Sequence, residues 1–176
     1  MQLKNFRAEE FVSPETFAIH GNKSISMIDK ELLLFIENFH PFCAKHFGGK
    51  VVIKINDWLW NGRFSQRGLR DFHYYSDKLR LKLLRDPTLE EATAYFNKSR
   101  SQHKFGRGLD FDVYVDGARI DPDVIRQLII DNRHLFWICA ISFIEDGVNW
   151  VHVDTRSTYD FLVVWHVKTG AVVTYS

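Results

Sequence analysis

The sequence predicts an α+β fold, with helices flanking a mostly antiparallel sheet, in a single domain over residues 1–176. Two observations predict this class. Helical periodicity dominates the first part of the chain, and two pairs of apolar strands, centred on Asp146-Gly147 and Thr169-Gly170, follow near its end. A chain of 176 residues is long enough for one buried core and too short for two ordinary domains.

The first strongly predicted helix begins near Ser26. Ser26 and Asp29 have the spacing of a capping box, and Gly48-Gly49 ends the helix after Phe47. Apolar residues recur between these limits at helical spacing, at Ile28, Leu32, Phe35, Ile36 and Phe39. The alternating segment "KVVIKIN", residues 50–56, predicts a strand directly afterwards.

The segment from Asp57 to Arg100 is less regular and begins with a predicted loop, "NDWLWNGRFSQRG". We expect a helix over residues 74–84 and a second helix from Thr88, where Thr88 and Glu91 form a capping box. Further on, Asp121-Pro122 supplies an N-cap and a first-turn proline for another helix.

Composition excludes some classes of protein. Lysine and arginine number 23 against 22 aspartates and glutamates, so the net charge of +1 gives no electrostatic case for a nucleic-acid partner. No apolar run approaches the ~20 residues that span a bilayer, and no signal-peptide core precedes the first helix. We therefore expect cytoplasmic synthesis without membrane insertion. Cys43 and Cys139 are expected to be buried, reduced thiols.

The segment "SQHKFGRGLDFDVYV" carries the first candidate site residues. Gly106 and Gly108 separate His103 from Asp110 and suit a tight bend before a strand that begins at Leu109. Such a bend lets the two side chains converge.

A second histidine lies in "NWVHVDTR", where a strand period of two puts Trp150, His152 and Asp154 on one face. His103, Asp110 and His152 would give zinc three protein ligands and leave its fourth position for water, as catalytic sites do. Taken alone, either histidine could instead pack, cap or face solvent.

These two segments resemble a known family. "SQHKFGRGLDFDV" is similar to the S-x-H-x-x-G-x-(A/G)-x-D signature of the zinc D-Ala-D-Ala carboxypeptidases and L-alanyl-D-glutamate endopeptidases. "WVHVDTR" is similar to the later strand of that family, which carries a metal-binding histidine, and the resemblance is close to phage and bacterial members with a similar HVD segment. "NFRAEEFVSPE" and "IENFHPFCAKHFGG" extend a weaker resemblance over most of the chain.

The resemblance implies one zinc ion held by His103, Asp110 and His152 in the fold shared with the Hedgehog signalling domain. It further implies hydrolysis in the peptide stems of peptidoglycan, by a phage enzyme that acts on the cell wall after release or as a virion component. Ser101 matches the serine of the signature and could support the site by hydrogen bonding; a turn hydroxyl is the alternative.

The chain departs from the family pattern at two places. Asn149 stands where the family has its general base, and an amide cannot accept that proton. The available replacements are Asp146, Glu145 and the favoured Asp154, which could equally orient a ligand. No arginine is in register with the substrate-binding arginine of many relatives; the nearest is Arg63, followed by Arg67 and Arg70.

Tryptophans supply the remaining substrate candidates. Trp150 precedes the second histidine, and Trp58 and Trp60 could line a groove or pack in the core. The sequence thus predicts a zinc-dependent peptidoglycan peptidase. The rival prediction is a non-catalytic structural or binding protein, such as a virion component with virion proteins as partners.

Overall fold

The computed structural model describes residues 3–136, 141–156 and 161–175. Its sheet has the order β1-β2-β5-β4-β6-β7, and β3 pairs with β2. All pairs are antiparallel except β4 with β6, so the predicted α+β class with a mostly antiparallel sheet is confirmed. The strands are β1 (Val51–Lys54), β2 (Gly108–Val115), β3 (Ala118–Arg119), β4 (Phe143–Asp146), β5 (Val151–Asp154), β6 (Leu162–His166) and β7 (Val172–Tyr175).

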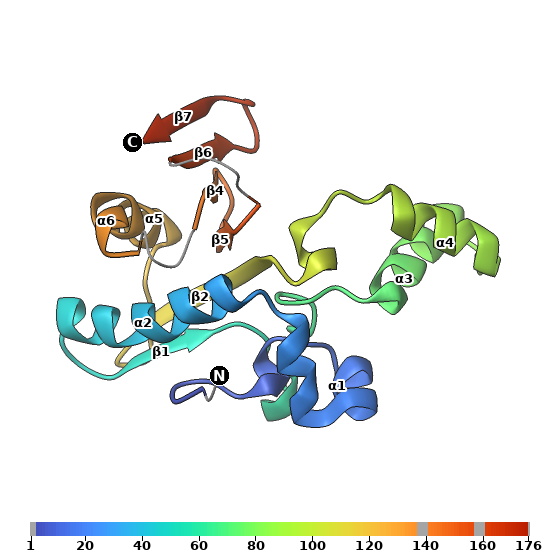
Figure 1. The fold of residues 1–176 in the computed structure, drawn as a ribbon, viewed down its shortest axis with the longest axis horizontal. Coiled ribbons are helices and arrows are strands. Elements are labelled where there is room, and N and C mark those ends of the chain that lie inside the picture. The colour runs from blue at the N-terminus through green and yellow to red at the C-terminus, as the bar shows by residue number, and fades with distance from the viewer. Residues whose placement is uncertain (1–2, 137–140, 157–160, 176) are drawn as a thin grey trace.

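Helices lie against the sheet and beside it (Figure 1). They are α1 (Pro14–His20), α2 (Lys30–Phe47), α3 (Phe72–Leu83), α4 (Leu89–Lys98), α5 (Pro122–Asp131) and α6 (Arg133–Phe136). Short 3-10 helices cover Ala8–Glu10, Gly21–Met27, Trp58–Trp60 and Gln102–Phe105. The capping box of Thr88 with Glu91, the N-cap at Asp121 and the end of α2 at Phe47 are confirmed.

The predicted start of α2 is wrong. Ser26 lies within the 3-10 helix Gly21–Met27, and its hydroxyl donates to the carbonyl of Lys23 at 2.8 Å. Asp29 is the N-cap instead, because its carboxylate accepts the backbone N–H of Glu31 at 2.9 Å. Aspartate is as good an N-cap as serine, so the residue nearer to the apolar stripe takes the position.

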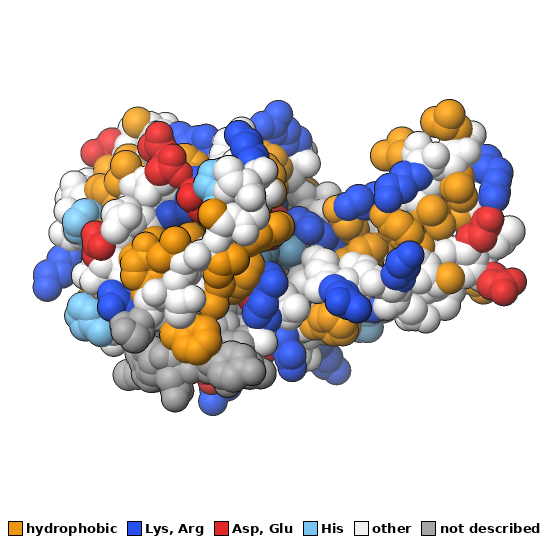
Figure 2. All heavy atoms as spheres, turned by 90° about the horizontal axis from the view of Figure 1, so that it is seen from above, with side chains coloured by type: hydrophobic (Ala, Val, Ile, Leu, Met, Phe, Trp, Pro, Cys, Tyr) orange, Lys and Arg blue, Asp and Glu red, His pale blue; other side chains and the backbone are white. Residues whose placement is uncertain are grey.

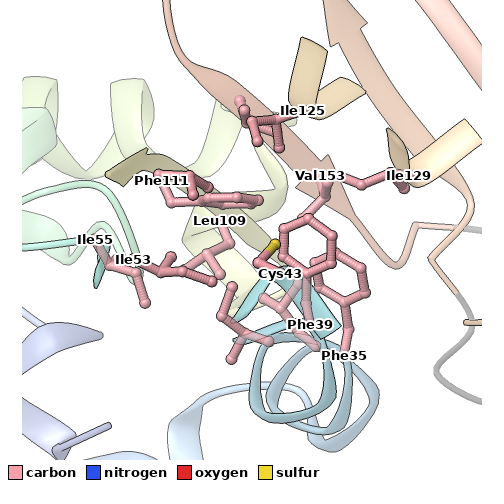
Figure 3. Close-up of a cluster of buried hydrophobic side chains, with 14 of the residues drawn as sticks. Phe35, Phe39, Cys43, Ile53, Ile55, Leu109, Phe111, Ile125, Ile129 and Val153 are labelled. Carbon is pink, nitrogen blue, oxygen red and sulfur yellow. The ribbon is translucent and has the colours of Figure 1, made fainter. Parts of the chain in front are cut away.

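One face of the sheet is covered by α2 and α5. Alternate residues of β2, Leu109 and Phe111, lie in the same apolar cluster as Phe39 of α2 and Ile125 of α5 (Figure 3). Cys43 lies in this core, where burial raises the pKa of its thiol to about 12, as expected of an unreactive cysteine. Cys139 is outside the described residues. Asp110 and Asp112 alternate with Leu109 and Phe111 along β2, so they lie on the opposite face of the sheet.

Helices α3 and α4 form a pair that stands away from the rest of the molecule, which we call the arm (residues 72–98; Figures 1 and 2). Its internal packing is aromatic: the Tyr75 ring lies 5.3 Å from that of Phe96, and the Phe72 ring 5.7 Å from that of Phe96. The arm therefore has a small core of its own.

Across the described ranges, no helix combines the length and the apolar character that a membrane span requires.

Candidate metal centre

Three buried side chains meet on the face of the sheet opposite α2. Asp110 of β2 is the register partner of His152 of β5, and His103 comes from the 3-10 helix that precedes β2. The Asp110 Oδ1 atom lies 2.7 Å from His152 Nδ1 and 3.2 Å from His103 Nε2, and the two nitrogens are 3.3 Å apart. Ligands of tetrahedral zinc are separated by about 3.3 Å, so this group could hold a metal ion.

Two glycines allow His103 to approach the sheet. Gly106 has a φ of +66°, and a Cβ atom there would lie 2.0 Å from the carbonyl oxygen of Met27. A Cβ atom at Gly108 would come within 3.0 Å of the His103 backbone nitrogen. The predicted tight bend before β2 is therefore confirmed, although the strand begins at Gly108 and not at Leu109.

Outer hydrogen bonds fix both imidazole rings. His103 Nδ1–H donates to the carbonyl of Gly68 at 2.7 Å, which leaves Nε2 facing the centre. His152 Nε2–H donates to Asp154 Oδ2 at 3.2 Å, which leaves Nδ1 facing the centre. Outer partners of this kind orient the histidines of metal sites and set their tautomers.

The Asp110 carboxylate has its two oxygens in different roles. Oδ1 faces both histidines, whereas Oδ2 accepts from Arg70 Nη2 at 2.7 Å. Burial by itself would raise the pKa of Asp110, but the nearby histidines hold that pKa well below its usual range. Asp110 is thus ionised and offers one oxygen as a ligand.

The two histidines differ in basicity. Burial lowers the pKa of His103. Burial acts in the same direction on His152, but its hydrogen bonds with Asp110 and Asp154 outweigh that effect and raise its pKa to about 9. In the absence of a metal, the proton of the centre therefore resides on His152.

A pocket of about 130 Å³ opens onto the centre. Ser101 and Trp150, two of the residues expected from the sequence, line it together with His103, Asp110 and His152. The Trp150 indole N–H is buried and has no hydrogen-bond partner within the described part of the chain. A group that enters the pocket could accept this hydrogen bond.

Asn149, at the family's general-base position, and the three carboxylates that could replace it lie in different surroundings. Asp154 is fully buried, does not line the pocket, and bonds with both His152 and Arg156. Asp146 faces Arg126, with 3.3 Å between Oδ1 and Nε. Asn149 is exposed, and its carbonyl accepts from Arg119. These contacts favour the alternative role of Asp154, that of orienting a ligand.

Glu145 is the carboxylate that lines the pocket beside the candidate ligands. It is the register partner of His152 on β4, so Asp110, His152 and Glu145 form one row across three strands on the same face. Within the ranges described, no hydrogen bond or ion pair holds the Glu145 carboxylate.

The arginines that line the pocket are not Arg63, the substrate-binding candidate that the sequence favours. Arg63 is exposed and lies over the Phe64 ring, whereas Arg67 pairs with Asp112 at 2.6 Å. Arg70 and Arg156 reach the pocket. The position of Arg156 in "HVDTR" was the available signal, because it stands two residues after Asp154, the last residue of β5.

The tryptophans Trp58 and Trp60 do not line this pocket. The Trp58 indole N–H donates to the backbone carbonyls of Glu9 and Val12, so it packs at the N-terminal segment, and Trp60 is exposed.

Comparison with protein-family models, curated proteins and solved structures gave no match to the chain.

Proposed function

We propose that this chain is a zinc metallopeptidase that hydrolyses an amide bond in the peptide stems of peptidoglycan, on a fold like that of the Hedgehog and DD-peptidase domains. The observation that carries the proposal is the pair of oriented histidines, each with one ring nitrogen facing Asp110 Oδ1, beside a pocket lined by the Glu145 carboxylate. The substrate class rests on the resemblance of "SQHKFGRGLDFDV" and "WVHVDTR" to the peptidase signature.

The donor set fits zinc. Two neutral imidazole nitrogens and one carboxylate oxygen are the ligands of many catalytic zinc sites, and the pocket leaves room for water and a substrate carbonyl. When bound, zinc would supply Lewis acidity, which polarises the carbonyl and makes water more acidic.

The remaining steps belong to side chains of the chain itself. We assign Glu145 as the general base, which takes a proton from the attacking water and passes it to the leaving amine. Asp154 keeps the His152 ring in place through Nε2, and Arg70 holds Asp110 through Oδ2. Arg156, whose side chain is 40% exposed, presents positive charge to the oxygen of the cleaved amide.

The test is incubation of the zinc-loaded chain with defined muropeptides, followed by mass spectrometry of the products. We expect one new amine and one new carboxylate at a single stem position, with no cleavage after chelation. One bound zinc without cleavage of any stem bond would support the rival function, a non-catalytic structural or binding protein.

A further inference from the structure

A second, larger cleft runs along the arm and adjoins the pocket of the metal centre. Its volume is about 370 Å³, and it is lined mainly by residues of α3 and α4. Arg70 and Ser101 line both cavities, so the cleft continues the pocket toward the arm. A molecule with one bond at the metal centre could extend into this cleft.

The cleft is strongly basic. Lys78 and Lys82 of α3 and Lys98 of α4 line it, and no acidic residue among those that the structure describes does. None of these three lysines has an ion-pair partner in the described part of the chain. Basic side chains are visible along the arm in the space-filling view (Figure 2). An uncompensated cluster of like charges is unfavourable by itself and favours an anionic ligand.

Tyrosine rings hold the ammonium groups along the cleft. Lys78 Nζ lies 5.7 Å from the ring centroid of Tyr74, and Lys82 Nζ lies 5.1 Å from that of Tyr95. These cation–π contacts restrict the lysines without neutralising their charge. The tyrosines also offer apolar faces to a ligand backbone.

We propose that the cleft binds a carboxylate-bearing segment of the peptide whose amide bond lies at the metal centre; this inference rests on the proposed peptidase function. Lys78 and Lys82 are four residues apart on one helix, about 6 Å along its axis. Side chains on the same side of an extended peptide repeat at about 7 Å, so two carboxylates of one strand match the two ammonium groups. The shared Arg70 and Ser101 favour a peptide substrate over an unrelated polyanion.

The test compares two ligands with the full-length, zinc-loaded chain carrying Glu145→Gln, which prevents turnover during binding. The ligands are a stem peptide with free carboxylates and the same peptide with its carboxylates amidated. Binding is measured by calorimetry for this chain and for the same chain with Lys78→Gln and Lys82→Gln. Lys23→Gln with Lys168→Gln, two exposed lysines outside the cleft, is the matched control.

We expect the Lys78 and Lys82 replacements to raise the dissociation constant of the free-carboxylate peptide by about five- to thirtyfold, and to leave that of the amidated peptide unchanged. The control variant should bind both peptides as the parent does. Carboxylate-dependent binding without any hydrolysis by the wild-type chain would refute the peptidase function and keep the cleft assignment. Equal affinity for both peptides, or an unchanged affinity for the free-carboxylate peptide after the lysine replacements, would overturn the assignment.

Discussion

At the residue scale, the two histidines of the metal centre are held by different outer partners. His103 donates to a backbone carbonyl, that of Gly68, whereas His152 donates to the carboxylate of Asp154. A carboxylate makes the ring to which it is bonded more basic. Burial lowers the pKa of His103, whereas at His152 the hydrogen bonds with Asp110 and Asp154 together outweigh burial and raise the pKa.

The separate roles of Glu145 and Asp154 lead to a matched pair of variants. We expect Glu145→Gln to lower kcat by about 10²- to 10⁴-fold while one zinc per chain is retained, because only proton transfer is lost. Asp154→Asn should instead weaken zinc binding by about 10- to 100-fold, because it loosens the His152 ring. Steady-state kinetics at saturating zinc, with metal analysis, separate these effects. Loss of hydrolysis in zinc-saturated Asp154→Asn, with full activity in Glu145→Gln, would return the role of general base to Asp154.

Zinc binding should also depend on pH. The pKa of His152 is about 9 in the metal-free chain, so this ring carries a proton at neutral pH that a metal must displace. We expect release of about one proton per zinc at pH 7 and about a tenfold rise in apparent affinity from pH 7 to pH 8. Calorimetry in buffers of different ionisation enthalpy measures the released proton. A zinc affinity independent of pH in this range would contradict the assignment of His152 as a ligand.

At the element scale, the turn between the 3-10 helix Gln102–Phe105 and β2 positions His103. The backbone N–H of Asp29 donates to the carbonyl of Gly106 at 2.9 Å, which ties this turn to the start of α2. The backbone N–H of Arg107 donates to Gln102 at 2.9 Å and closes the turn. The position of His103 therefore depends on a short segment packed against a long helix.

Gly106→Ala tests that dependence. The left-handed backbone alone costs about 1–2 kcal/mol for a non-glycine residue, and contact with the Met27 carbonyl adds to this, so both stability and zinc affinity should fall. Gly170→Ala is the control, because its φ is +74° but nothing lies within 4 Å of the added Cβ atom. Thermal unfolding with and without zinc measures both effects. Equal losses of zinc affinity in Gly106→Ala and Gly170→Ala would show that the turn does not position His103.

Local signals predicted elements better than they predicted the site. Thr88 with Glu91 and Asp121 with Pro122 act within one turn of helix, so the sequence alone predicts the starts of α4 and α5. Glu145 could only be named as an alternative, because its place beside His152 depends on the register of β4 with β5. Arg70 is also fixed by a distant contact, its ion pair with Asp110 forty residues away.

At the scale of the whole molecule, the sheet separates the apolar core from the candidate metal centre. Leu109, Val153 and Ile144 form a buried row on the side of α2 and α5, and Asp110, His152 and Glu145 form the neighbouring row on the other side. The arm adds a basic cleft next to that second row. The charge of +1 for the whole chain hides this local excess, because acidic residues lie elsewhere.

The central claim is that one metal ion at His103, Asp110 and His152 is required for amide hydrolysis. The most direct measurement is a titration of the metal-free chain with zinc, in which bound zinc and the rate of stem-peptide hydrolysis are followed together. We expect the rate to rise in proportion to bound zinc and to stop rising at one zinc per chain, with both signals lost in His103→Ala. Hydrolysis by the metal-free chain, or one bound zinc without hydrolysis, would contradict the claim.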